Sequence, residues 1–133
     1  MKRNMASGAC EAFVFATVAV AAAFGNFGSA LAAICVRSSS FHLTSEGPWN
    51  GAITTSSGKP CGGSFRAGGP IRFKRLYLAT PPQNGTVSLR EGGYYSYQSK
   101  PGYRGPDVFM LRICGTEQTA EGCANVRYSV TVE

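Results

Sequence analysis

Few side chains in this chain are suited to nucleophilic or acid–base chemistry. It contains a single histidine, His42, which follows the serines at 38–40, and a single aspartate, Asp107. Nucleophilic catalysis requires a general base within reach of the nucleophile. We interpret a histidine near serines in a predicted first strand as a solvated polar residue. The sequence therefore predicts no catalytic residue and no enzyme, and a small hydrolase is the least favoured function.

The remaining carboxylates and cysteines also lack the arrangement that a glycosidase or a metal site requires. A catalytic carboxylate pair would have to combine Asp107 with glutamates that we place in turns or loops, whereas such a carboxylate needs partial burial to shift its pKa. These glutamates are Glu46, Glu91, Glu117 and Glu121. One histidine and no Cys-x-x-Cys pair also argue against zinc. We expect no metal and no cofactor.

Positive charge is most concentrated in and just before the segment 71–80. The cations of this stripe are Arg66, Arg72, Lys74 and Arg75. A stripe of this kind can attract an anionic glycan or a lipid headgroup, and we expect such a partner, or an unknown protein, rather than nucleic acid. The alternative interpretation is that these cations protect a sheet edge from aggregation.

The aromatic residues are concentrated in the second half of the chain. Tyr94, Tyr95, Tyr97 and Tyr103 could form a stacking platform for sugars or bases. Cross-strand aromatics that fill a small core are the commoner arrangement, and we favour it here. Trp49, which we place in a turn, is either an exposed anchor or a cover on one end of the core.

Short alternating segments separated by turn residues predict an all-β chain. The dipeptides Asn84-Gly85 and Gly92-Gly93 indicate turns, and 101–106 indicates a crossover loop. The expected strands are 34–43, 52–55, a short one from Cys61, 71–80, 86–89, 94–98, one through Phe109, Leu111 and Ile113, and 124–132. Within 71–80 the apolar parity changes, which predicts a bulge near Lys74-Arg75. No segment after residue 33 has helical periodicity, so we predict an antiparallel β-sandwich of about seven strands.

The stretch from Pro82 to Phe109 contains a P-x-N-G-T-V segment, an aromatic strand and then G-Y-x-G-x-D-x-F. The residues of this pattern are Pro82, Asn84, Gly85, Thr86, Val87, Tyr97, Gly102, Tyr103, Gly105, Asp107 and Phe109. In this pattern the chain resembles bacterial Ig-like and cadherin-like repeat domains. The resemblance covers about Leu76–Val132 and implies an Ig-like sandwich in a surface protein. Members often occur as tandem repeats, whereas this chain is a single copy with added cysteines. Cadherin-like calcium sites need several converging carboxylates, so we interpret Asp107 as a turn-stabilising acceptor.

The N-terminus has the pattern of a secretory signal peptide. Lys2 and Arg3 precede an apolar run at 12–24, and small residues follow up to Ala32. We predict cleavage after Ala32, which gives a signal peptide at 1–32 and one Ig-like domain at 33–133. A retained anchor is the alternative. After cleavage no transmembrane span is expected, the net charge is about +5, and the location is periplasmic or secreted.

Four cysteines remain in the predicted domain, and an even number in a small exported domain indicates two disulfides. Cys114 and Cys123 share an outward parity at facing ends of consecutive strands, so we pair them. The other predicted pair is Cys35 with Cys61. A bridge from Cys61 to Cys114 between the sheets is the alternative.

Together these features predict an exported, non-enzymatic Ig-like binding or structural module of the bacterial envelope. The alternative is a secreted inhibitor or ligand-capture protein that acts through the loops 45–51 or 116–122.

Overall fold

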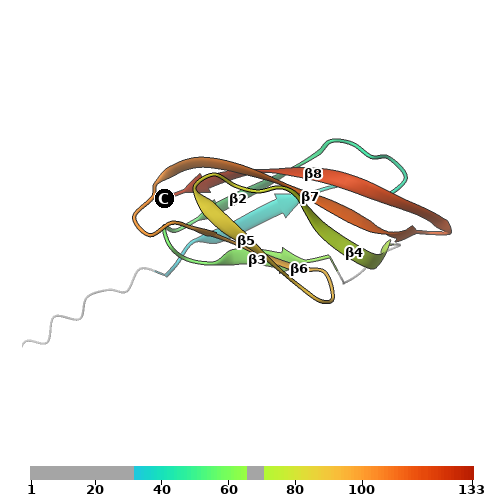
Figure 1. Ribbon diagram of the computed structural model, residues 1–133, viewed down its shortest axis with the longest axis horizontal. Helices are drawn as coiled ribbons and strands as arrows, with labels where there is room; N and C mark the ends of the chain where they lie inside the picture. Colours follow the sequence, from blue (N-terminus) through green and yellow to red (C-terminus); the bar gives the residue numbers. More distant parts are fainter. Residues whose placement is uncertain (1–31, 66–70) are drawn as a thin grey trace, which may run out of the picture. The chain divides into compact units, whose positions relative to one another are not determined.

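The computed structural model describes residues 32–65 and 71–133, and these residues form two β-sheets without a helix (Figure 1). The strands are β1 (Cys35–Ser39), β2 (Trp49–Thr55), β3 (Cys61–Ser64), β4 (Ile71–Thr80), β5 (Gly85–Arg90), β6 (Tyr94–Ser99), β7 (Gly105–Glu117) and β8 (Ala120–Val132). One sheet has the order β1-β2-β8-β7-β4 and the other has the order β3-β6-β5. The predicted all-β sandwich is confirmed.

The order of the strands is that of an immunoglobulin-like sandwich. In that fold the strands C, F and G face B, E and D, and here β4, β7 and β8 face β3, β6 and β5. Two details differ from the prediction. There are eight described strands, and β2 pairs with β8 in parallel, whereas every other pair is antiparallel. Each of the eight strands corresponds to one of the expected segments, and β2 lies between β1 and β8.

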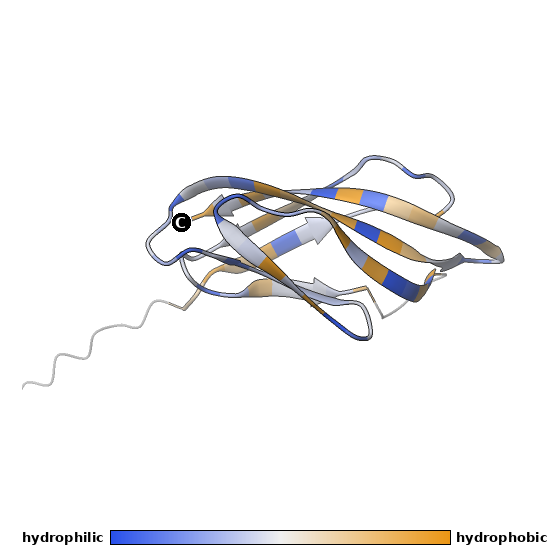
Figure 2. Cartoon of the chain, viewed as in Figure 1, coloured by the Kyte–Doolittle hydropathy of each residue, from blue (hydrophilic) through white to orange (hydrophobic). Residues whose placement is uncertain are grey.

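The core lies between the sheets and is built by alternating residues of the long strands. Figure 2 shows hydrophobic and hydrophilic residues alternating along these strands. Phe109, Leu111 and Ile113 of β7 are fully buried, as are Val126 and Tyr128 of β8. Since a strand directs successive side chains to opposite faces, the same alternation places Arg112 of β7 and Asn125 and Arg127 of β8 on the outer face.

Two predicted features of the β4–β6 region are confirmed. The register of β4 against β7 shifts between Phe73 and Arg75, so Lys74 is a bulge residue. Gly92 and Gly93 have φ values of 84° and 80° and form the turn between β5 and β6. That left-handed conformation favours glycine.

The predicted turn at Asn84-Gly85 is wrong in its geometry. Neither residue has a positive φ, and Gly85 begins β5. Glycine is required there for another reason: a Cβ at Gly85 would lie 2.5 Å from the carbonyl oxygen of Gln98 on β6. The dipeptide therefore allows two strands to approach closely.

Several element boundaries also differ from the prediction. The first strand ends at Ser39, so His42 lies in the following loop, and Trp49 begins β2 instead of lying in a turn. Glu117 and Glu121 lie in β7 and β8. The pairing of β7 with β8 continues beyond the alternating apolar residues, because backbone hydrogen bonding does not depend on the side chain.

The expected crossover loop is shorter than predicted, because β7 already begins at Gly105 and includes Pro106. A proline is tolerated at this position. The β4 pairing ends at Met110, so β7 has only β8 beside it at Pro106.

No helix in the described part of the chain is long and apolar enough to cross a membrane. The predicted signal peptide and most of its cleavage region lie outside the described residues.

Candidate functional site

The carboxylate of Asp107 is buried and accepts hydrogen bonds from four groups. The backbone N–H groups of Gln83 and Asn84 donate at 3.1 and 3.0 Å, that of Val108 at 2.9 Å, and the Tyr97 hydroxyl at 2.9 Å. These are the backbone hydrogen bonds expected for a turn-stabilising acceptor. All four donors belong to the protein itself, which leaves little of the carboxylate for a ligand.

The tyrosines divide between the core and the surface. Tyr95 and Tyr97 are buried between the sheets, and burial raises the pKa of both phenols, so they remain neutral at physiological pH. Tyr103 is half-buried against the core, and its hydroxyl donates to the carbonyl of Pro106. Tyr94 is 40% exposed. The four therefore do not form one stacking platform.

His42 contacts Glu117, a contact that the sequence did not suggest. Nδ1 of His42 lies 2.9 Å from Oε1 of Glu117, and Oε2 of the same carboxylate accepts the N–H of Leu43 at 2.7 Å. The His42 ring meets the Trp49 ring edge-on at 5.3 Å. The hydrogen bond with His42, aided by that with Leu43, lowers the pKa of Glu117. This cluster attaches the loop after β1 to the end of β7.

No serine hydroxyl takes part in the contacts of His42 that the described structure contains. A nucleophile–base pair is therefore not assembled here. Within residues 32–65 and 71–133 there is also no group of three or more His, Cys, Asp or Glu side chains able to hold a metal ion.

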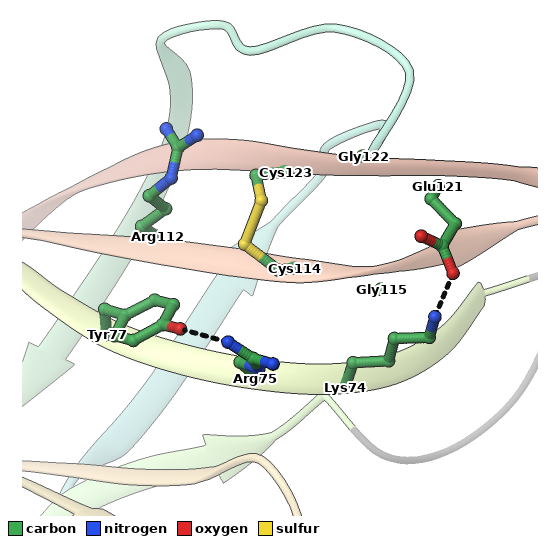
Figure 3. A pocket seen from close by; sticks show the side chains of 9 residues that line it. All are labelled: Lys74, Arg75, Tyr77, Arg112, Cys114, Gly115, Glu121, Gly122 and Cys123. Carbon is green, nitrogen blue, oxygen red and sulfur yellow. Dashed lines mark hydrogen bonds and ion pairs between the residues drawn. A yellow bond between two sulfur atoms is a disulfide. The ribbon is translucent and has the colours of Figure 1, made fainter.

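Both predicted disulfides are present. Cys35 of β1 is bonded to Cys61 of β3, which joins the two sheets. Cys114 and Cys123 are directly opposite each other on β7 and β8 and are also bonded. The parity argument placed the second disulfide on the outer face of the larger sheet, where it lies among the basic residues (Figure 3).

Three of the four predicted cations lie on β4, which is an edge strand that pairs only with β7. The fourth, Arg66, lies outside the described residues. Arg72 and Arg75 lie opposite Thr116 and Cys114 of β7, whereas Lys74 occupies the bulge. The predicted bulge interrupts the regular alternation between Arg72 and Arg75, and Arg72 and Lys74 both line a further hollow.

A hollow of about 550 Å³ lies on this outer face. Figure 3 shows Lys74, Arg75 and Tyr77 along β4, with the disulfide between Cys114 and Cys123 beside them on β7 and β8. Gly115 and Gly122 also line this hollow. We call this surface the basic face and define it by Arg72, Lys74, Arg75, Tyr77 and Arg112.

The charges of the basic face are not equally available to a ligand. Lys74 forms an ion pair with Glu121, and this contact lowers the pKa of Glu121. Figure 3 shows Arg112 directed across β8 and away from β4. There its guanidinium contacts Glu46 at 3.4 Å and Asn125 at 3.3 Å.

Arg75 and Arg72 have no carboxylate partner among the described residues. Nη1 of Arg75 donates a long hydrogen bond of 3.4 Å to the Tyr77 hydroxyl, and Arg72 is exposed. Tyr77 is itself 45% exposed. Two uncompensated guanidinium groups and a tyrosine therefore form the part of the basic face that is open to a ligand.

Sequence reasoning missed Tyr77, Arg112 and Glu121 as parts of this site. Tyr77 has the outward parity once the bulge is taken into account, so the bulge prediction could have found it. Arg112 lies on β7 and Glu121 on β8, far from β4 in sequence, so the sequence gives no signal that they lie near the cations of β4.

No family model matches the chain, and no curated protein matches it in sequence.

Proposed function

We propose that residues 33–133 form an exported, non-enzymatic Ig-like module that binds anionic glycans of the bacterial envelope through the basic face. The observation that carries this proposal is the pair of Arg72 and Arg75 on one edge strand, which lack carboxylate partners among the described residues. Arg75 lines the hollow of about 550 Å³, and Arg72 lines an adjoining one with Lys74. The resemblance to bacterial Ig-like and cadherin-like repeats supports the same class of protein.

The expected interaction is weak and depends on salt. Surface charges act over a Debye length of about 8 Å at physiological ionic strength, and two exposed guanidinium groups provide few contacts. Tyr77 adds a flat ring on which a sugar can rest. A polymer repeats the same charged unit, so a polymeric surface offers a high local concentration of sites to which the protein can rebind.

The experiment compares salt-dependent retention on a carboxylated polysaccharide matrix. Arg72→Glu/Arg75→Glu should elute at low salt, whereas the parent protein should require more. Lys100→Glu/Arg104→Glu is the matched control because it makes the same change in net charge at two exposed positions outside the hollow.

Equal loss of retention in both double variants would show that only net charge matters and would contradict the proposed site. The same comparison on vesicles with anionic lipid headgroups tests the lipid alternative. Preferential binding to the vesicles would replace the glycan by a lipid surface.

Export is the second part of this proposal. The two disulfides support it, because disulfides form and persist mainly in oxidising compartments. Intact-mass analysis of the exported protein should give a chain that begins at Ala33. Recovery of the uncleaved chain in the membrane fraction would favour the retained anchor instead.

A loop-based inhibitor or ligand-capture protein is the second candidate. Its support is that the loop after β1 and the β7–β8 hairpin meet: the carbonyl oxygen of Leu43 would lie 1.9 Å from a Cβ at Gly122, and His42 contacts Glu117. The segment just before the predicted loop 45–51 therefore contacts the predicted loop 116–122, and the carbonyl oxygen of Glu46 accepts the N–H of Asn125 on β8. Co-purification of a stoichiometric protein partner, lost on substitution in these loops, would favour this candidate.

A further inference from the structure

A second hollow, of about 350 Å³, lies on the three-stranded sheet and is separate in position from the basic face. Arg37, Arg90 and Tyr94 contribute to its lining, together with the consecutive glycines Gly62 and Gly63 of β3. No acidic residue lines it. This combination of two arginines, an aromatic ring and a pair of glycines is not used by the function proposed above.

The glycines create the space that one arginine occupies. A Cβ at Gly62 would lie 1.9 Å from the carbonyl oxygen of Tyr95, so no side chain fits there without a shift of the backbone. A Cβ at Gly63 would lie 2.7 Å from Nε of Arg37. The guanidinium of Arg37 therefore lies where the side chain of residue 63 would otherwise be.

The backbone that carries Arg37 is held by a disulfide close to it in sequence. Arg37 belongs to β1 of the larger sheet, whereas Gly63 belongs to β3 of the smaller one. Cys35 lies two residues before Arg37, and its disulfide to Cys61 joins the same two strands. Residues two apart in a strand point to the same side, so the disulfide and the arginine cross between the sheets together.

The second arginine is held by an aromatic ring. Arg90 and Tyr94 are directly opposite each other at the end of the β5–β6 hairpin, and the guanidinium carbon lies 5.7 Å from the centre of the Tyr94 ring. A cation–π contact of this kind restricts the guanidinium. Its N–H groups remain available for an oxyanion, which is the ligand that the planar donor arrangement of arginine fits best.

Neither arginine forms an ion pair within the described part of the chain. Two guanidinium groups without a counter-charge, both held in place by other parts of the protein, line one hollow. Its volume lies at the lower end of the range of small-molecule sites, about 300 to 1,000 Å³. It is therefore suited to a single anionic unit and not to a long segment of polymer.

We propose that this hollow binds the oxyanion group of one acidic sugar unit, held by Arg37 and Arg90. The shared chemistry is a carboxylate, sulfate or phosphate oxyanion. This hollow shares no lining residue with the hollow of about 550 Å³ on the basic face, although Arg90 also lines a third hollow with Lys74, Arg75 and Tyr77.

The test is a nuclear magnetic resonance titration of the purified, disulfide-bonded protein with three probes: glucuronate, inorganic sulfate and inorganic phosphate. The amide signals of Gly62 and Gly63 should shift in a saturable way with at least one probe. The probe that binds most tightly identifies the source of the oxyanion. The absence of saturable shifts with all three probes would overturn the proposal.

Substitutions test whether the two arginines hold the oxyanion. Arg90→Gln should weaken the binding at least tenfold, and Arg37→Gln should do the same. Arg104→Gln is the matched control because Arg104 is exposed and does not line the hollow. An equal loss of affinity in Arg104→Gln would contradict the assignment.

Arg37 lies next to the disulfide of Cys35 and against Gly63, so its variant could disturb the local fold, and Arg90→Gln with Tyr94→Leu then provides the decisive pair. Tyr94→Leu removes the ring that restricts Arg90 and should also weaken binding. Unchanged affinity in both of these variants would overturn the proposal. Arg72→Glu/Arg75→Glu should keep this binding even where retention on the polysaccharide matrix is lost, which separates this site from the basic face.

Discussion

The hydroxyl of Tyr97 donates a hydrogen bond of 2.9 Å to the buried carboxylate of Asp107, and this bond crosses from one sheet to the other. Tyr97 lies on β6, and Asp107 lies near the start of β7. The same carboxylate also accepts the N–H groups of Gln83 and Asn84. One side chain therefore fixes the segment before β5, the middle strand of the small sheet and the start of β7.

Asp107→Asn should destabilise the fold by about 1 to 3 kcal/mol, because an amide cannot replace a charged acceptor of several hydrogen bonds. Urea denaturation measures this difference. Glu91→Gln, in an exposed turn, is the control and should have little effect. Any glycan retention per folded molecule should be unchanged, and a variant with parental stability but lost retention would make Asp107 a binding residue.

Tyr97→Phe should cost about 1 kcal/mol, since it removes one hydrogen-bond donor and leaves the ring stacked on Phe109 at 5.8 Å. Combined with Asp107→Asn in a double-mutant cycle, it should give a coupling energy of about 0.5 to 3 kcal/mol. Strict additivity of the two effects in denaturation experiments would show that the inter-sheet hydrogen bond contributes no net stability.

Removal of the two disulfides should have unequal effects. Cys35–Cys61 closes a sequence separation of 26 residues, and Cys114–Cys123 closes one of 9. The chain-entropy relation gives about 3.6 and about 2.7 kcal/mol for these loops. Paired alanine variants compared by thermal unfolding should therefore show the larger loss for Cys35→Ala/Cys61→Ala. The reverse order would show that loop length does not determine the difference.

The contact between His42 and Glu117 should make the stability depend on pH on the acid side. The hydrogen bond with His42 lowers the folded-state pKa of Glu117 below its ordinary value of 4.5. A carboxyl group with a lowered pKa stabilises the fold above its unfolded-state pKa, and this contribution is lost as the pH falls through the folded-state pKa.

The parent protein should therefore be more stable than Glu117→Gln near neutral pH, and the difference should shrink as the pH falls below about 4.5. Fluorescence of Trp49, the only tryptophan in the chain, reports on this loop because the ring contacts His42. Glu91→Gln is again the control. A difference between parent and Glu117→Gln that does not change with pH would contradict the assignment.

Cys114 and Cys123 could be paired from the sequence, because the face to which a strand residue points is a local property. The outward parity of Cys114 and Cys123 follows from the apolar alternation around them. The bulge near Lys74-Arg75 was also predictable, because the apolar parity of 71–80 changes at that point. In both cases the information lies within about ten residues of chain, where backbone geometry alone relates one side chain to the next.

The sequence also determined the type of fold and the residue that links its parts. Turn residues between alternating segments specify strands, and Asp107 next to a strand specifies a backbone acceptor. The role of Asn84-Gly85 was misjudged because a turn dipeptide and a close approach between strands both require a small residue. Only the position of β6 beside β5 distinguishes the two.

The tertiary structure alone decided which charges are available. Glu121 neutralises Lys74 across a sequence separation of 47 residues, and Glu46 meets Arg112 across 66. Arg37 reaches the glycines of β3 because the sheets are packed and cross-linked. These contacts depend on strand order and sheet packing, which bring together residues far apart in sequence, so neither composition nor local periodicity carries a signal of them.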